Sequence, residues 1–173
     1  SLDSHSHASV RRLSQRYVNT FMSELMKFLN PFKQNKTVDP FWGELKFDGG
    51  TWNGSKRFAP SEAEVSVYLA GTENGVSDFC TPAFTELEKR YSELQESIAI
   101  ELSNMVITQL SKSSRTELTS SNILAQVELE QIWVKGAGEF ELFYGFNEGS
   151  EFDTFEITLF LKGWKPLAHS IGD

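Results

Sequence analysis

The stretch Thr81–Leu110, TPAFTELEKRYSELQESIAIELSNMVITQL, decides the fold. Apolar residues recur along it every three or four positions, which is the spacing of one face of an α-helix. Thr81 suits the N-cap, and Pro82 suits the first helical position, where a missing N–H costs nothing. A helix of this length extends about 45 Å, enough to cross a whole domain. The residues expected on its buried face are Phe84, Leu87, Tyr91, Leu94, Ile98, Leu102, Met105 and Leu110.

Short segments with strand character lie on both sides of this helix. Asp48-Gly49-Gly50 and Asn53-Gly54 are typical of turns between them. Connections this short join antiparallel neighbours, and strands segregated from a helix define the α+β class. We therefore predict a single antiparallel sheet of about six or seven strands, in the order β-β-β-α-β-β-β, covered by the long helix. The expected strands are Trp42–Phe47, Thr51–Trp52, Ser55–Phe58, Glu62–Ala70, Val127–Lys135, Glu139–Phe146, Thr154–Lys162 and a short Trp164–His169.

The N-terminal part of the chain has a different pattern. Residues 1–7 suggest a disordered tail or an expression remnant, residues 8–37 an amphipathic helix with a linker, and residues 38–173 the α+β domain. Residues 8–30 combine an apolar stripe with arginines and lysine. Such a helix docks on its own domain or on a second copy, or lies on an anionic membrane surface.

Charge is distributed unevenly. The 173 residues have a formal net charge of −8. Residues 1–46 hold seven Lys/Arg against four Asp/Glu, and residues 47–173 hold nine against twenty, a net of −11. An acidic body repels phosphate backbones, so we expect no nucleic-acid partner. Its acidity either attracts a basic protein or keeps the chain in solution.

Cys80 is the only cysteine, so neither an intrachain disulfide nor a thiolate metal cluster can form. A single thiol fits the reducing cytoplasm. Its place before the helix allows either a lowered pKa or a buried, inert thiol, and we expect the second.

Chemical signatures are sparse. The phosphate-loop, dinucleotide, zinc-protease and nucleophile-elbow motifs do not occur in the sequence. His169 is the one histidine within the predicted domain. Alternation places Glu128, Glu130, Glu139 and Glu141 opposite the main aromatic rows, as on a solvated sheet face. We expect no catalytic, cofactor-binding or metal-binding residues.

Tryptophans beside turns either anchor a partner or close the ends of a core. Trp52 precedes Asn53-Gly54, and Trp164 follows Gly163. The loop from Asn147 to Asp153 is acidic but lacks the pattern of a calcium loop. The candidate partner-binding residues are Trp52, Trp164, Glu148, Glu151 and Asp153.

Asp39-Pro40-Phe41-Trp42-Gly43-Glu44-Leu45 resembles the opening of a group of bacterial domains of unknown function, in which a short Lys-rich start precedes this strand. The resemblance covers residues 26–173. It implies an interaction role, since some members are proposed to be immunity proteins that neutralise a toxin, and it supplies no catalytic residues. The basic helix before Met26 departs from the family's short start. The further matching segments are Met26–Lys33, Arg57–Pro60, Arg90–Leu94 and His169–Asp173.

The leading hypothesis is therefore a non-enzymatic protein-interaction module, immunity-like, that binds a basic protein partner. The alternative is a small-molecule-binding domain or hydrolase that uses His169 and the acidic loop residues. A third hypothesis is a peripheral membrane protein held by residues 8–30. The sequence leaves the oligomeric state open.

Overall fold

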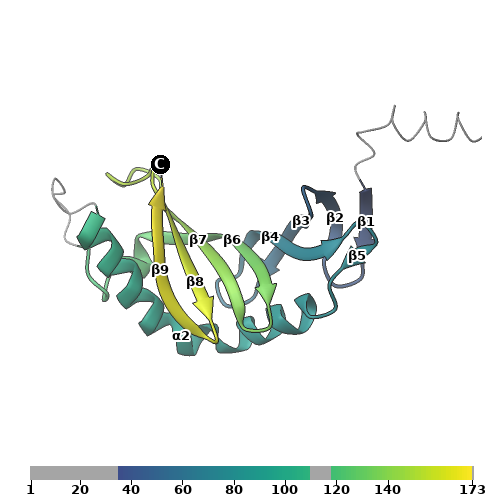
Figure 1. The fold of residues 1–173 in the computed structure, drawn as a ribbon. Coiled ribbons are helices and arrows are strands. Elements are labelled where there is room, and N and C mark those ends of the chain that lie inside the picture. The colour runs from purple at the N-terminus through teal and green to yellow at the C-terminus, as the bar shows by residue number, and fades with distance from the viewer. Residues whose placement is uncertain (1–34, 110–117, 173) are drawn as a thin grey trace, which may run out of the picture. The chain divides into compact units, whose positions relative to one another are not determined.

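The computed structural model describes residues 35–109 and 118–172, except for the side chains of Asn35, Ala168 and His169. These residues form a nine-stranded sheet with one long helix across it (Figure 1). The predicted tail 1–7, the predicted helix 8–30 and Leu110 lie outside the described residues. Residues 35–37 were predicted as part of the linker, and this is wrong, because they pair with the next strand as part of β1 (Asn35–Asp39).

Five strands precede the helix and four follow it. The first group is β1, β2 (Gly43–Asp48), β3 (Thr51–Phe58), β4 (Ala63–Thr72) and the two-residue β5 (Gly75–Val76). The helix α2 runs from Cys80 to Gln109 and is followed by a short 3-10 turn, η1 (Ile123–Ala125). The second group is β6 (Val127–Gly136), β7 (Glu139–Phe146), β8 (Glu156–Lys162) and β9 (Lys165–Gly172). The strand order is β1-β2-β3-β4-β6-β7-β8-β9, with β5 paired only to β4.

The α+β class and the long covering helix are confirmed. The predicted six or seven strands, three before the helix and three after it, are too few, since five strands precede α2 and four follow it. The purely antiparallel sheet is also wrong at one joint. β4 and β6 pair in parallel, from Ser66 opposite Gln131 to Leu69 opposite Val134. The reason is the helix itself: α2 carries the chain back along the sheet, so the next strand starts in the same direction as β4. The sheet is therefore mixed, with two antiparallel meanders joined edge to edge.

The turn predicted at Asn53-Gly54 is also wrong. Both residues lie inside β3, where Asn53 pairs with Tyr68 and Gly54 with Val67. Gly54 is needed there for close approach: a Cβ at this position would lie 2.7 Å from Leu45 Cδ2 and 2.8 Å from the Glu44 carbonyl oxygen. The glycine thus marks tight packing against β2 and not a change of direction.

The predicted buried face of α2 is largely confirmed. Leu94 is only partly buried against the core. The N-terminal half of the helix packs into an aromatic cluster, in which the Phe84 ring lies 5.0 Å from that of Trp42 and 5.8 Å from that of Phe58. Each fully buried apolar side chain contributes about 1.5–3 kcal/mol of transfer free energy. The stripe residues that are buried as predicted are Phe84, Leu87, Tyr91, Ile98, Leu102 and Met105.

Candidate protein-interaction face

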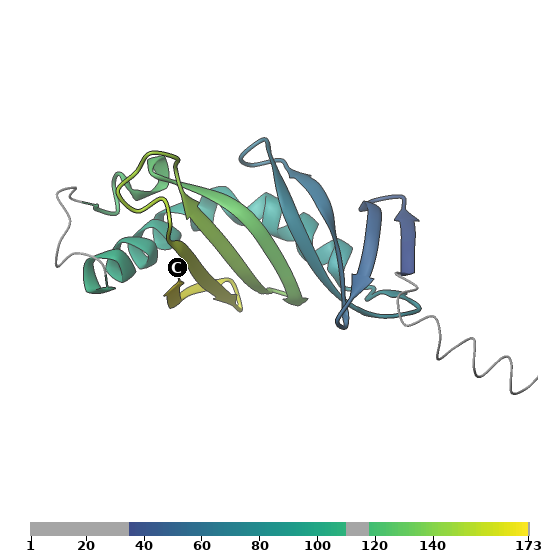
Figure 2. The same cartoon turned by 90° about the horizontal axis from the view of Figure 1, so that it is seen from above.

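The sheet has one covered face and one open face. Val67 and Leu69 of β4 and Ile132 of β6 point towards α2 and are buried. In the part of the chain that the structure describes, no helix covers the opposite side, which we call the open face; α2 lies behind the strands (Figure 2). A row of paired positions crosses this open face: Lys46, Asn53, Tyr68, Trp133, Glu141 and Phe160.

The centre of the open face is aromatic. The rings of Tyr68 and Trp133 are stacked with centroids 4.8 Å apart, and Phe143 lies 5.7 Å from Trp133. All three side chains are half-buried, although they lie on the side away from the helix. Lys135 Nζ lies 4.4 Å from the Trp133 ring centroid and 3.1 Å from Glu141 Oε1. We call Tyr68, Trp133 and Phe143 the aromatic cluster of the open face.

The buried indole N–H of Trp133 has no hydrogen-bond acceptor in the described structure. Tryptophan usually finds a partner for this group when it is buried. A pre-formed aromatic surface with an unsatisfied donor is more typical of a binding surface than of a purely solvated sheet face.

Carboxylates flank the aromatic cluster on the β6–β8 side. A β-bulge places the extra residue Glu130 between Leu129 and Gln131, and the Glu130 carboxylate lies directly over Gly145. Glu156 is opposite Gly145 in the register and accepts a 3.4 Å hydrogen bond from Gln131 Nε2. Burial, and next the negative charge of Glu130, raise the pKa of Glu156. Two carboxylates therefore repel each other here, and a cation placed between them would relieve that repulsion.

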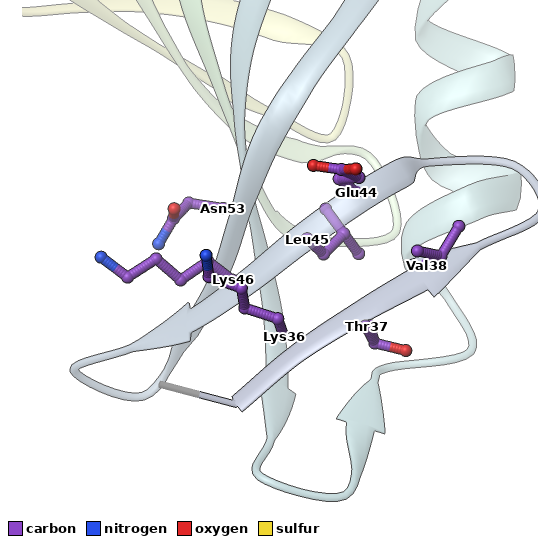
Figure 3. Close-up of a pocket in the computed structure, with 7 residues that line it drawn as sticks. All are labelled: Lys36, Thr37, Val38, Glu44, Leu45, Lys46 and Asn53. Atoms are coloured by element: carbon purple, nitrogen blue, oxygen red, sulfur yellow. The ribbon is translucent and has the colours of Figure 1, made fainter. Parts of the chain in front are cut away.

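The far end of the open face, on the β1–β2 hairpin, is basic. Lys36 is opposite Lys46 in the register, and the two side chains lie beside each other near Asn53 (Figure 3). Like charges on directly opposite residues are unfavourable. A cavity of about 520 Å³ over the hairpin is lined by Lys36, Thr37, Val38, Glu44, Leu45, Lys46 and Asn53. The open face is thus basic over β1–β2, aromatic in the middle and acidic over β6–β8.

The candidate residues taken from the sequence do not form one site. Trp52 is 3% exposed and its Nε1–H donates to the Thr72 carbonyl oxygen at 2.8 Å, so it belongs to the core and not to a binding surface. Trp164 is half-buried in the β8–β9 turn, with its ring 5.5 Å from that of Phe140 and the Arg90 guanidinium 4.9 Å above it.

Glu148, Glu151 and Asp153 are exposed on the loop that precedes β8. Because Trp164 follows β8, the seven residues of that strand separate it from this loop by about 20 Å.

The features needed for catalysis do not come together in the described residues. His169 lies in β9, but its side chain is outside the described residues. No group of three His, Cys, Asp or Glu side chains suited to a metal ion is found in 35–109 and 118–172. Cys80 is buried, its Sγ–H donates to the Ala70 carbonyl oxygen at 3.5 Å, and burial raises its pKa to about 11. The expectation of a buried thiol is therefore confirmed, and its lack of reactivity stays a prediction.

No family model matches the chain, and no solved structure matches it. The fold and the site define only a class: an α+β domain with one aromatic sheet face that no helix of residues 35–109 and 118–172 covers. Within the described ranges, no helix combines the length and the hydrophobicity needed to cross a membrane.

The aromatic cluster of the open face escaped prediction, although a signal was present. In β4, β6 and β7, every second residue is apolar and buried, and the residues between them face the other side of the sheet. Tyr68, Trp133 and Phe143 are at these in-between positions. Such positions normally carry small polar or charged residues, as Ser66 and Glu141 do. Aromatic residues at such positions on three strands are the signal that distinguishes this face from an ordinary solvated one.

Proposed function

We propose that this chain is a non-enzymatic protein-interaction module that binds a basic protein partner with the acidic and aromatic part of its open face. The observation that carries the proposal is the half-buried aromatic cluster Tyr68, Trp133 and Phe143, on a side that no described helix covers. Rigid aromatic side chains are the commonest anchors of protein interfaces. The resemblance to proposed immunity proteins supports a basic toxin as the partner.

The size of the open face supports this role. Eight strands spaced about 4.8 Å apart span about 34 Å, and strands of seven residues are about 23 Å long. Their product is roughly 800 Å² for the whole face. The aromatic and acidic part, on the neighbouring strands β4, β6, β7 and β8, is about 14 Å wide and covers roughly 330 Å², so it fits one basic segment of a partner and a small interface.

The charges determine where the partner sits. Glu130 and Glu156 lie beside the aromatic cluster and would pair with lysine or arginine side chains. Lys36 and Lys46 would repel the same partner from the β1–β2 end. The partner's basic surface is therefore expected over β6, β7 and β8, and the association should weaken with salt.

The test compares two charge reversals on opposite sides of the sheet. Glu130→Lys lies beside the aromatic cluster, and Glu93→Lys makes the same charge change on the exposed side of α2. The intact chain is used at low salt to capture partners from the source organism, starting with products of neighbouring genes. The affinity of each variant for the captured protein is then measured by calorimetry.

We expect a basic protein whose binding is weakened at least tenfold by Glu130→Lys and by Trp133→Ala, and less than twofold by Glu93→Lys. A tenfold loss corresponds to about 1.4 kcal/mol, well within what an interface anchor contributes. The proposal fails if the captured protein is acidic, if both charge reversals have the same effect, or if no protein binds at low salt.

A further inference from the structure

The two meanders of the sheet separate at the end where β4 and β6 begin. Their parallel pairing starts only at Ser66 and Gln131. Ahead of those residues β4 continues to pair with β3, and β6 with β7. The bulge at Glu130 bends β6 at this point, as an inserted residue does. Figure 2 shows the two strands diverging beyond their paired segment.

A cavity of about 290 Å³ lies at this divergence, between the sheet and α2. Its walls are mixed in polarity, and Ala63, Leu124 and Leu129 contribute apolar surface from three different elements. Gln95 and Glu128 also line it and supply polar groups. The volume is at the lower end of the range for small-molecule sites, which suits a ligand of roughly ten non-hydrogen atoms.

Two buried tyrosine hydroxyls line the same cavity. Tyr91 Oη lies 3.1 Å from Tyr144 Oη, and the residues are 6% and 1% exposed. Two hydroxyls carry two protons, and the bond between them uses only one. For the second proton, the described residues supply no acceptor. A buried O–H without an acceptor is unfavourable, so this position is prepared for an acceptor from outside the protein.

We propose that this cavity, called here the tyrosine pocket, binds a small uncharged aryl carbonyl compound whose oxygen accepts the second tyrosine proton. The apolar surface of the walls fits the aryl group, and the carbonyl supplies the missing acceptor. An anionic ligand is disfavoured by Glu128 and by the negative charge of the body. Burial raises the pKa of both tyrosines, so the hydroxyls stay protonated at neutral pH and act as donors.

The pocket is distinct from the open face, and its test needs no protein partner. Benzamide is titrated into the full chain and followed by two-dimensional NMR, with benzoate and toluene as comparison probes. Benzamide offers a neutral acceptor, benzoate the same shape with a negative charge, and toluene an aryl group without an acceptor. We expect benzamide to bind most tightly and to perturb Leu124, Leu129 and Tyr144.

The informative variant removes both hydroxyls, because either one can donate once the other is gone. Tyr91→Phe/Tyr144→Phe is expected to weaken benzamide binding about three- to tenfold, the effect of one neutral hydrogen bond, and to leave toluene unaffected. Ser66→Ala, which removes an exposed hydroxyl that does not line the pocket, is the control and should leave benzamide binding unchanged. If the double variant does not fold, Ser61→Trp blocks the pocket from an exposed position and should abolish binding.

The proposal is overturned by any of three results. Benzamide binding that is equal in the wild type, the double variant and Ser61→Trp would place the probe elsewhere. Equal affinities for benzamide and toluene would remove the role of the hydroxyl proton. A crystal structure in saturating benzamide with only a water molecule at the hydroxyl pair would show that solvent satisfies that proton.

Discussion

Gly54→Ala tests the packing of β3 against β2 directly. The new methyl carbon would lie 2.7 Å from Leu45 Cδ2 and 2.8 Å from the Glu44 carbonyl oxygen, distances that real Cβ atoms essentially never adopt. The leucine end can move, but the carbonyl oxygen is fixed in the ladder between β1 and β2. Overpacking of this kind costs about 1–3 kcal/mol, and the backbone contact argues for about 3.

Urea unfolding followed by circular dichroism measures this loss. With a slope of about 2 kcal/mol per molar urea, a loss of about 3 kcal/mol lowers the midpoint by roughly 1.5 M. Gly172→Ala is the control, because nothing lies within 4 Å of a Cβ there, and it should change stability by less than about 0.5 kcal/mol. Adding Leu45→Ala to Gly54→Ala should cost less than the sum of the two single losses. Equal midpoints for the two glycine variants would refute the close-approach argument.

Three further predictions concern the core, the thiol and the carboxylate pair. Leu102→Ala, at a fully buried position, should cost about 2–5 kcal/mol in thermal unfolding, whereas Leu94→Ala should cost about half as much. Cys80 should resist iodoacetamide until the chain unfolds. Because burial raises the pKa of Cys80 from 9.0 to about 11, the protonated thiol favours the folded state fully below pH 9, and about 2 kcal/mol of that stability is lost between pH 9 and 11, which alkaline melting curves would detect. Glu130→Gln removes one charge that raises the pKa of Glu156. That raised pKa disfavours the fold as pH increases above 4.5, so the variant should gain a few tenths of a kcal/mol at pH 7 and nothing at pH 3.

The helix and the strands could be predicted from the sequence where apolar residues recur at a regular spacing and all of them face the core. The three- and four-residue spacing from Phe84 to Met105 identified the helix and its buried face. It did not reveal that Leu94 is only partly buried, because periodicity gives the direction of a side chain and not the depth of packing at that point. Strand alternation likewise identified β7 and β8 almost to the residue.

The prediction from the sequence was wrong where the same residues are compatible with two different local structures. Asn53-Gly54 favours a tight turn, yet here the glycine allows β3 to approach β2. The parallel joint of β4 and β6 depends on how the chain crosses the sheet, which no local pattern encodes. Trp52 was a candidate anchor because it precedes the turn predicted at Asn53-Gly54. That turn does not form, and Trp52 is instead a buried residue of β3.

The short parallel joint also affects how the two meanders unfold. Only four residue pairs hold β4 to β6, and α2 adds a second link between the meanders. Its first turns contact the aromatic side chains before the joint, and its later turns pack beneath the strands after it (Figure 1). Because α2 packs against both meanders, we expect the two meanders to unfold together with the helix as one cooperative unit. Backbone amides of Ser66–Leu69 should exchange with deuterium only as fast as those in the middle of α2.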